Sequence, residues 1–374
     1  MKICQISPPF IPVSSSIVYG GVERVVYRLD KTLTELGHET SVIAPKGSKT
    51  IGRLYESINQ TIHSPTGYCV DMYSVDLPSL YLRFEHMSEA VRIANENDFD
   101  IIHCHDENML SHLQLIEKPS LYTIHSPPEE LWQVDTHPKL FSQNLNISVV
   151  SKKIRDLFNE TGYDIKYVVP NGIDVTEDYF SKEKAGYIFS LSIIAPRKGQ
   201  HIAIDVAKYL GKDLIIGGNI GDESYWENKV KPHITDSIEN KQDKLNSYLQ
   251  LPKNSTKIVY AGALDDSQKF PLYKYAQAFL MPSCFEDPMP LVVIEAMGCG
   301  TPVVAFRRGG IPEMVTHGTS GYLVDTEEEM IDAVKEINKI NPAVCREYCM
   351  KNFSARKMAE DYLAVYRDII ESSK

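Results

Sequence analysis

The chain has 374 residues, 43% of them hydrophobic, which is enough for two domains with a core each. Its 39 Lys and Arg against 50 Asp and Glu give a formal net charge of −11, which argues against a nucleic-acid partner because phosphate backbones bind basic surfaces. No apolar run reaches the ~18–20 residues of a membrane span, and the seven cysteines lack the spacing of a disulfide framework, so we expect a cytoplasmic protein with peripheral membrane contact left open.

The first half of the chain alternates between predicted strands and helices. Strands are expected at residues 2–7, 40–44, 101–105, 120–125, 147–150 and 167–169, and helices at residues 20–36 and 85–96. Short β-rich runs that are separated by helices indicate a parallel sheet covered on both faces.

The alternation restarts after a stretch rich in acidic and turn-forming residues, 174–186. Strands are expected at residues 187–194, 213–216, 257–260, 278–281 and 302–306, and helices at residues 201–210, 291–297 and 355–372. The predicted fold class is α/β, with two doubly wound Rossmann-like domains that face each other across a cleft. We place them at residues 1–178 and 179–354, followed by a C-terminal helix within residues 355–374. Such domains bind ligands at the carboxyl ends of their strands, so the loops there are the places to search.

The most informative segment, residues 281–313, has the sequence MPSCFEDPMPLVVIEAMGCGTPVVAFRRGGIPE. Pro288 and Pro290 set the first turn of a helix, where a missing N–H does no harm. The N–H groups of that turn form an anion site, and the carboxylates of Asp287 and Glu295 add acceptors for hydroxyl groups. Phosphates beside hydroxyl groups indicate a sugar nucleotide.

Two further loops carry groups suited to phosphate. Gly20 and Gly21 follow the first strand and open a helix, so backbone N–H groups can approach a phosphate or a hydroxyl closely. Lys198 lies beside Gly199 at a helix start, where it can neutralise a diphosphate. The alternatives are a plain turn at the glycines and an exposed basic helix start at Lys198.

Histidines lie at the ends of two predicted strands. Alternation along a strand places His103 and His105 on one face, which would suit a metal pair, but a third ligand at a recognisable spacing is missing. We therefore expect no metal and interpret His103 as a core histidine. His105, at the strand tip, is a site candidate.

Residues 281–313 resemble the sugar-nucleotide signature of the family 4 (group 1) retaining glycosyltransferases, which have the GT-B fold. That signature is a carboxylate, seven residues, then Glu-Ala-Met and a Gly-Thr-Pro-Val-Val strand. Asp287 and Glu295 occupy its two acidic positions, the first of which is usually Glu in the family. Similar family segments are found at residues 19–26, 105–108, 123–125, 170–174 and 196–199, with Glu107 where the family often has Pro.

The resemblance implies transfer of a sugar, with retention, from a nucleotide-activated donor and without a metal or other cofactor. Asp287 would hold hydroxyls of the donor sugar, Glu295 the nucleotide ribose, and Lys198 the diphosphate. His105 would position the reacting sugar and the acceptor, and His125 has an acceptor-side or a structural role. The other donor-binding candidates are Gly20, Gly21, Asn171, Arg197, Met289, Pro290 and Leu291. Expected partners are a UDP-, GDP- or ADP-sugar and a carbohydrate or lipid-linked acceptor, and the last helix is expected to cross back to the acceptor-side N-terminal domain.

The largest departure from the family concerns the diphosphate site. The family pairs the lysine with an arginine five or six residues earlier, where this chain has Ile193 and Ser192. Either Arg197 supplies the second cation or diphosphate binding is weakened. A catalytically weak or inactive sugar-nucleotide-binding homologue, or a partner subunit, is therefore the alternative. A phosphorylase-like or epimerase-like relative would need a cofactor lysine or a different set of acids, neither of which is evident in this chain. A nicotinamide oxidoreductase would need the G-x-G-x-x-G spacing, which residues 217–221 do not have.

Overall fold

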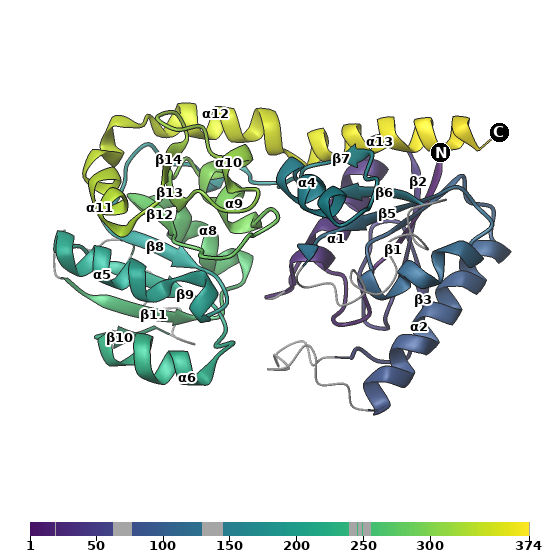
Figure 1. The fold of residues 1–374 in the computed structure, drawn as a ribbon, viewed down its shortest axis with the longest axis horizontal. Helices are drawn as coiled ribbons and strands as arrows, with labels where there is room; N and C mark the ends of the chain where they lie inside the picture. Colours follow the sequence, from purple (N-terminus) through teal and green to yellow (C-terminus); the bar gives the residue numbers. More distant parts are fainter. Residues whose placement is uncertain are drawn as a thin grey trace. The chain divides into compact units, whose positions relative to one another are not determined.

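A computed structural model describes residues 1–18, 20–62, 77–128, 145–238, 245, 249 and 256–373. The chain forms two compact units, one of residues Met1–Gly172 with Ala355–Lys374 and the other of residues Ile173–Ser354. Each unit contains a seven-stranded sheet with helices packed around it (Figure 1). All described strand pairs are parallel. The predicted α/β class, with two doubly wound Rossmann-like domains, is confirmed.

The first sheet has the strand order β3-β2-β1-β4-β5-β6-β7. Its strands are β1 (Lys2–Ile6), β2 (Glu39–Ala44), β3 (Arg53–Glu56), β4 (Ile101–Cys104), β5 (Ser120–Ile124), β6 (Asn146–Val149) and β7 (Tyr167–Val168). Helices of the same unit are α1 (Gly21–Glu35), α2 (Leu77–Glu96), α4 (Lys152–Glu160) and α13 (Ala355–Ser372). The strand order reverses between β1 and β4, so the loops that follow these two strands are the expected ligand site of the unit.

The second sheet has the order β10-β11-β9-β8-β12-β13-β14 and reverses between β8 and β12. Its strands are β8 (Ile188–Leu191), β9 (Leu214–Gly217), β10 (Asp236–Ser237), β11 (Ile258–Gly262), β12 (Ala278–Met281), β13 (Val303–Phe306) and β14 (Gly321–Val324). The helices that matter for the site are the 3₁₀ turn η5 (Pro196–Lys198), α5 (Gln200–Leu210), α8 (Asp266–Tyr275) and α9 (Leu291–Gly298). Further helices are α6 (Glu223–Tyr225), α10 (Ile311–Met314), α11 (Glu327–Glu336) and α12 (Pro342–Phe353).

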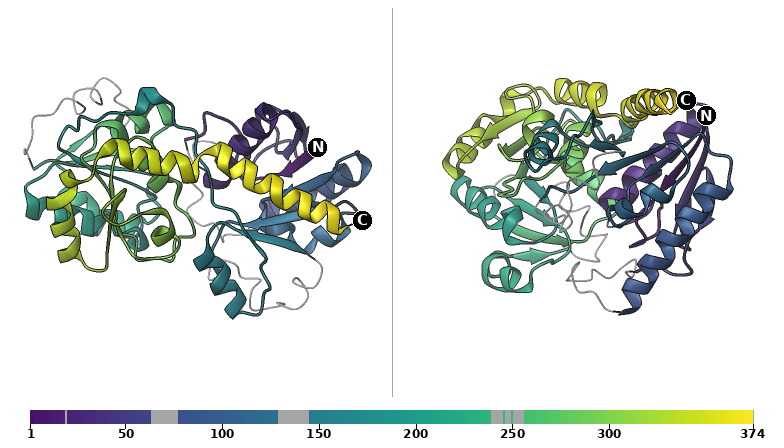
Figure 2. Two further views of the ribbon diagram at one scale, coloured as in Figure 1. Left: turned by 90° about the horizontal axis from the view of Figure 1, so that it is seen from above. Right: turned by 45° about the vertical axis from the view of Figure 1, so that its right-hand side comes forward.

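Helix α13 belongs to the first unit although the whole second unit precedes it in the sequence. It packs against α1 and β5, and Figure 2 shows it in yellow, close to the N-terminus. Gly172 donates its N–H to Met358 Sδ at 3.1 Å, whereas Ile173 donates to Phe353 O at 2.8 Å within the second unit. The chain therefore passes between the units at residue 173, whereas the sequence suggested that the second domain begins at residue 179.

Several elements differ from the sequence-based expectation. Strand β3 has exposed and half-buried side chains only, and such an edge strand lacks the apolar run on which the prediction depends. Helix α2 begins at Leu77, eight residues before its predicted start at residue 85. Strands β10 and β14 and helices α4 and α8 were not predicted.

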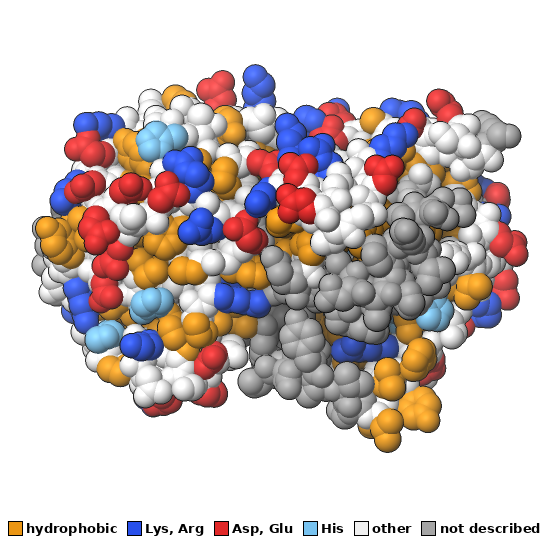
Figure 3. Space-filling model, viewed as in Figure 1, with side chains coloured by type: hydrophobic (Ala, Val, Ile, Leu, Met, Phe, Trp, Pro, Cys, Tyr) orange, Lys and Arg blue, Asp and Glu red, His pale blue; other side chains and the backbone are white. Residues whose placement is uncertain are grey.

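The described part of the chain contains no candidate membrane span, and its charges are mixed on the face that Figure 3 shows. No helix in the described ranges is both long and apolar enough to cross a bilayer. On the face in Figure 3, the acidic and basic side chains of the described residues are interspersed.

Candidate functional site

Two loops of the second unit meet where the strand order reverses. The first follows β8 and contains η5, and the second follows β12 and spans residues 282–290. Arg197 O accepts hydrogen bonds from Cys284 N at 2.9 Å and from Ser283 Oγ at 3.4 Å. Gly199 has a φ of 72°, and a Cβ at that position would lie 2.1 Å from Pro282 O. Only glycine allows the two loops to approach this closely.

An ion pair joins the same two loops. Lys198 Nζ donates to Asp287 Oδ2, and the two side chains are only 12% and 11% exposed. The ring of Phe285 lies beside both cations, with its centroid 5.3 Å from Lys198 Nζ and 4.9 Å from Arg197 Cζ. The structure thus brings together three predicted site residues, namely Arg197, Lys198 and Asp287. Of these, Arg197 is exposed and lies next to Lys198.

A third loop holds the main chain of Asp287. Gly310 donates its N–H to Asp287 O, and Gly309 donates to Glu286 Oε2, each at 2.8 Å. Gly309 has a φ of 53°, and a Cβ there would lie 2.1 Å from Asp287 O. Glu286 is therefore engaged by the loop after β13, while Asp287 is the carboxylate that faces Lys198.

Helix α9 follows directly and begins with the predicted proline. Pro290 is its N-cap and, like Met289, is buried, while Leu291 is half-buried. The N-cap side chain, that of a proline, makes no capping hydrogen bond to the first turn, and the N–H groups of a helix start are suited to an anion. Pro290 itself has no N–H, so it contributes geometry rather than a hydrogen bond.

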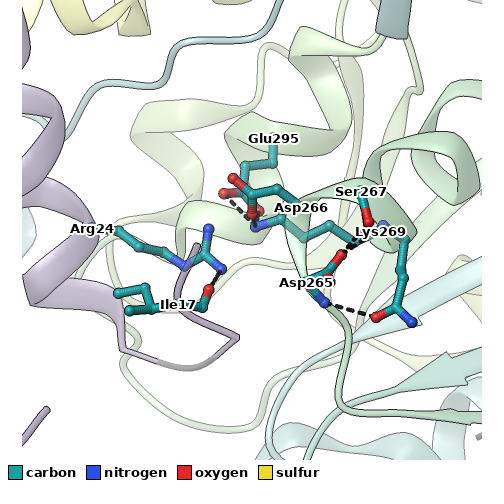
Figure 4. Close-up of polar contacts among 8 residues, drawn as sticks. Ile17, Arg24, Asp265, Asp266, Ser267, Lys269 and Glu295 are labelled. Carbon is teal, nitrogen blue, oxygen red and sulfur yellow. Dashed lines mark hydrogen bonds and ion pairs between the residues drawn. The ribbon is translucent and has the colours of Figure 1, made fainter. Parts of the chain in front are cut away.

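Glu295 lies in the second turn of α9 and is held by a lysine that the sequence analysis missed. Lys269 Nζ, from α8, donates to both carboxylate oxygens at 2.8 Å and lies 3.1 Å from Asp266 Oδ1 (Figure 4). Lys269 is 4% exposed and Glu295 is 1% exposed. No local pattern in the sequence marks this lysine as buried, because lysines are normally exposed.

The positions of the missing family arginine are used for packing. Gln200 Nε2 donates to Ser192 Oγ and to Ile193 O, each at 2.8 Å. A Cβ at Gly218 would lie 1.8 Å from Ser192 O, and one at Gly221 would lie 2.3 Å from Ile193 Cδ1. Gly218 and Gly221 thus allow the loop after β9 to pack closely on the loop after β8. This packing explains the two glycines without a role in dinucleotide binding.

Two histidines contact each other at the ends of β4 and β5 in the first unit. His105 Nδ1 and His125 Nε2 lie 3.0 Å apart, and their rings stack with centroids 5.3 Å apart. Burial lowers the pKa of His125 to about 4. Burial, together with His103 and His125, holds the pKa of His105 well below its usual range. Both rings are therefore neutral at physiological pH, and His105 Nε2 has no hydrogen-bond partner in the part of the chain that the structure describes.

His103 has a different environment from its neighbour. Its Nδ1 pairs with Tyr366 Oη and its Nε2 with Thr123 Oγ1, both at 2.7 Å. Thr123 Oγ1 continues the network to Ser148 Oγ at 2.6 Å and to Tyr362 Oη at 3.3 Å. His103 is thus a fully buried, hydrogen-bonded core residue that links the sheet to α13.

Buried carboxyl groups accompany the glycine loop of the first unit. A Cβ at Gly20, whose φ is 114°, would lie 2.7 Å from Glu23 Oε2. Burial, with a further contribution from Asp106, raises the pKa of Glu23 to about 7. Asp106 is 1% exposed, and its Oδ2 lies 3.7 Å from Nε2 of His86. The sequence analysis gave Glu23 and His86 no role, although Glu23 stands three residues after Gly20.

The predicted residues divide between the units. Gly20, Gly21, His105, His125 and the buried Asn171 belong to the first unit, and Arg197, Lys198, Asp287, Met289, Pro290, Leu291 and Glu295 to the second. Tyr19, which the family segment includes, lies outside the described residues. Arg24, near the glycine loop, donates from Nη2 to Ile17 O (Figure 4). Within the described ranges, no group of three or more His, Cys, Asp or Glu side chains could hold a metal ion.

Comparison with known families gives two matches that together run through most of the chain. Residues 19–177 match the model described as Glycosyltransferase Family 4, and residues 174–348 match Glycosyl transferases group 1. The phosphatidyl-myo-inositol mannosyltransferase of Mycolicibacterium smegmatis is 24% identical over an alignment of 337 positions, which covers 83% of this chain and 78% of the relative. The alpha-monoglucosyldiacylglycerol synthase of Acholeplasma laidlawii is 24% identical over an alignment of 408 positions, which covers 100% of this chain and 98% of the relative.

Solved structures share the fold over nearly the whole length. AviGT4, a glycosyltransferase involved in avilamycin A biosynthesis, superposes with a TM-score of 0.67 at 20% identity and covers 99% of this chain and 98% of its own. HepE from Anabaena, solved in complex with UDP-glucose, gives a TM-score of 0.68 at 18% identity, with coverage of 98% and 100%. At these identities the likeness shows a common GT-B fold.

Proposed function

Because the chain belongs to the group 1 glycosyl transferases of family 4, we propose that it is a retaining, metal-independent glycosyltransferase that takes its sugar from a nucleotide-activated donor. The observation that carries the proposal is the Lys198–Asp287 ion pair, formed by the loops after β8 and β12. One partner suits the diphosphate of a sugar nucleotide, and the other suits the hydroxyls of its sugar.

The chemistry requires charge stabilisation more than a strong nucleophile. When the bond from the anomeric carbon to the phosphate oxygen breaks, positive charge grows on the sugar and negative charge on the leaving diphosphate. Lys198, the adjacent Arg197 and the first turn of α9 would stabilise the diphosphate, because fixed cations and dipoles act most strongly where charge develops. Asp287 would hold the sugar by its hydroxyls, and neutral His105 would orient the reacting groups.

The donor and acceptor classes rest on the relatives. HepE was solved with UDP-glucose, and the two relatives above are named for mannosyl and glucosyl transfer to lipids. We therefore propose a UDP-, GDP- or ADP-sugar as donor and a carbohydrate or lipid-linked acceptor. Retention at the anomeric carbon is part of the proposal, and the anomeric configuration of the product in an NMR spectrum tests it.

A cytoplasmic location with peripheral membrane contact completes the proposal. Leu77, Tyr81 and Phe84 lie on one face at the start of α2 and are 69%, 73% and 50% exposed. Figure 3 shows hydrophobic side chains gathered at the lower right, over this part of the helix. Replacing the three by Ser should abolish co-sedimentation with anionic vesicles if they insert into a bilayer, and unchanged co-sedimentation would contradict this part of the proposal.

A non-catalytic sugar-nucleotide binder is the second candidate, and one observation favours it. Ile193 occupies a position of the family arginine and packs closely against Gly221, so that position contributes no cation. If the chain is an active transferase, Arg197 would have to supply the second positive charge at the diphosphate.

Two measurements separate the candidates. Thermal shift with UDP-, GDP- and ADP-sugars detects donor binding, because a ligand of the folded state raises its stability. Release of nucleoside diphosphate in the presence of candidate acceptors detects transfer, with Lys198→Ala as the inactive control and Lys208→Ala, an exposed lysine on α5, as the matched one. Binding without release favours the non-catalytic binder, and no response to any sugar nucleotide excludes both.

A further inference from the structure

Arg83 is the charged member of an otherwise apolar row on the inward face of α2. At about 3.6 residues per turn it shares this face with Met87, Ala90 and Ala94, which are all buried. Its Cζ lies 5.1 Å from the centroid of the Phe10 ring, in the loop after β1. This loop is one of the two at the point where the strand order of the first sheet reverses. The cation therefore lies against the expected ligand site of the first unit.

This half-buried arginine has no counter-ion in the part of the chain that the structure describes. No carboxylate there pairs with its guanidinium, and its buried Nε has no hydrogen-bond partner. Arg92, the other arginine of α2, is by contrast paired with Glu89 and Glu96. Because a buried donor without an acceptor costs stability, a ligand that supplies the acceptor would account for the arrangement. The planar fork of a guanidinium matches the oxygens of a phosphate.

The outward face of the same helix indicates what carries the phosphate. Leu77, Tyr81 and Phe84 form the exposed apolar face described above, and Arg83 lies about a third of a turn round the helix from its middle. A helix that rests on a bilayer buries its apolar face below the headgroups. A cation on the flank of that helix then lies at the level of the lipid phosphates, on the side of the loop after β1.

We propose that Arg83 binds the phosphate of an anionic lipid acceptor, which the protein meets through the apolar face of α2. The inference rests on the proposed function and on the first unit as the acceptor side. It narrows the acceptor from a carbohydrate or lipid to a lipid that bears a phosphate. The alternatives are a cation that only packs on Phe10 and a soluble phosphate ester as acceptor.

Two short-chain lipids that differ only by the phosphate provide the test. Dihexanoylphosphatidic acid and dihexanoylglycerol are titrated against the whole chain as monomers, below the concentrations at which they aggregate, so attraction to a charged surface plays no part. The measured quantity is the dissociation constant of the neutral lipid divided by that of the anionic lipid. We expect a ratio of about tenfold or more in the wild type, the usual effect of a hydrogen bond between charged groups.

Variants of the two arginines of α2 show whether Arg83 causes this discrimination. Arg83→Gln should bring the ratio to within about twofold of unity, because only the anionic lipid loses affinity. Arg83→Lys keeps the charge without the planar fork, so it should retain part of the ratio and provides the test if Arg83→Gln does not fold. Arg92→Gln is the matched control on the same helix and should leave the ratio unchanged.

Glycerol 3-phosphate separates a lipid from a soluble phosphate ester. It has the phosphate without acyl chains, so it should bind the wild type at least about tenfold more weakly than dihexanoylphosphatidic acid does. Replacing Leu77, Tyr81 and Phe84 by Ser should reduce this difference, because these side chains would contact the acyl chains. Equal affinities of the two phosphates in the wild type would overturn the assignment to a lipid.

The thermal shift with sugar nucleotides distinguishes a failure of this inference from a failure of the proposed function. A wild type that a sugar nucleotide stabilises, but that binds both lipids equally or neither, overturns this inference alone. An unchanged ratio in Arg83→Gln also overturns it and assigns the cation to packing on Phe10. A wild type that no sugar nucleotide stabilises overturns the proposed function, whatever the lipids show.

Discussion

Lys198 donates from Nζ to Asp287 Oδ2 and so joins residues that lie 89 positions apart in the chain. Each side chain follows a strand on one side of the point where the sheet order reverses, and each is nearly buried. The doubly wound topology therefore creates the pair, because it brings the carboxyl ends of β8 and β12 next to each other. The first prediction follows from this relationship.

Replacing Lys198 by Ala should weaken nucleoside diphosphate binding strongly and lower turnover by about 10²–10³-fold, because a fixed cation at the leaving group is lost. Arg197→Ala should have a smaller effect, since Arg197 is exposed. Isothermal titration with the preferred nucleoside diphosphate measures both. A Lys198→Ala variant that folds normally and keeps wild-type affinity would refute the assignment of Lys198 to the diphosphate.

Gly309→Ala tests whether the third loop positions Asp287. The substitution adds left-handed backbone strain and a Cβ 2.1 Å from Asp287 O, so the free energy of unfolding should fall by about 2–5 kcal/mol. Gly318→Ala is the matched control, because its φ of 79° is also positive but no atom lies within 4 Å of the added Cβ. It should cost about 1–2 kcal/mol. Denaturant melts give both values, and equal losses in the two variants would mean that the contact with Asp287 is unimportant.

His103, in β4, and His105, directly after this strand, should differ in function. His105→Ala should reduce turnover by about 10²-fold with a modest effect on stability, because a group that orients the reactants is lost. His103→Gln should instead reduce the free energy of unfolding by about 1–3 kcal/mol, since Tyr366 and Thr123 lose their partner. Steady-state kinetics and thermal melts on both variants separate the roles, and the reverse pattern would contradict the assignment.

Glu23 should give the first unit a distinct dependence of stability on pH. Its pKa is about 7 in the folded state against 4.5 ordinarily, so the folded state binds more protons between these values. The contribution of Glu23 to the free energy of unfolding is fully present below pH 4.5 and is lost as the pH rises through 7. The total change in this free energy is about 3 kcal/mol.

The buried histidines act in the opposite direction, because their lowered pKa values remove stability as the pH falls below 6.5. The difference between wild type and Glu23→Gln therefore isolates the carboxyl, and that difference should decline between pH 4.5 and 7. Glu35→Gln, an exposed position on the same helix, serves as the control. A flat difference curve for Glu23→Gln would show that this carboxyl does not titrate in the window.

Removal of divalent cations should leave transfer intact. The proposed mechanism assigns charge stabilisation to Lys198, Arg197 and the first turn of α9, so turnover after treatment with EDTA should lie within about twofold of the untreated rate. Restoration of a lost activity by added Mg²⁺ or Mn²⁺ would show instead that a metal assists the leaving group.

Much of the fold could be predicted because its strands are buried apolar runs between turn residues. The prediction failed where burial is partial, as in β3, an exposed edge strand without such a run. It also missed α8, which begins with a capping box formed by Asp265 and Gln268 but has a proline, Pro271, within it.

The site was predictable where topology alone brings residues together. His105 and His125 end adjacent strands, so their contact follows from the order of β4 and β5. The pairing of Lys269 with Glu295 could not be foreseen, because a lysine is normally exposed and the carboxylate that it meets lies 26 residues later in the chain. Glu23 was missed for a related reason, since its pKa depends on burial that no local pattern reveals.

The hydrogen bonds from Tyr362 and Tyr366 to the sheet have a consequence for biosynthesis. Residues 173–354 leave the ribosome before α13 does. The second unit can therefore complete its core while the first unit still lacks the helix that is hydrogen-bonded to its sheet. Domains usually fold in the order in which they are synthesised. In this chain the second unit should instead fold before the first. Protease treatment of nascent chains that are stalled before α13 emerges should therefore digest the amino-terminal part of the first unit and spare the second unit.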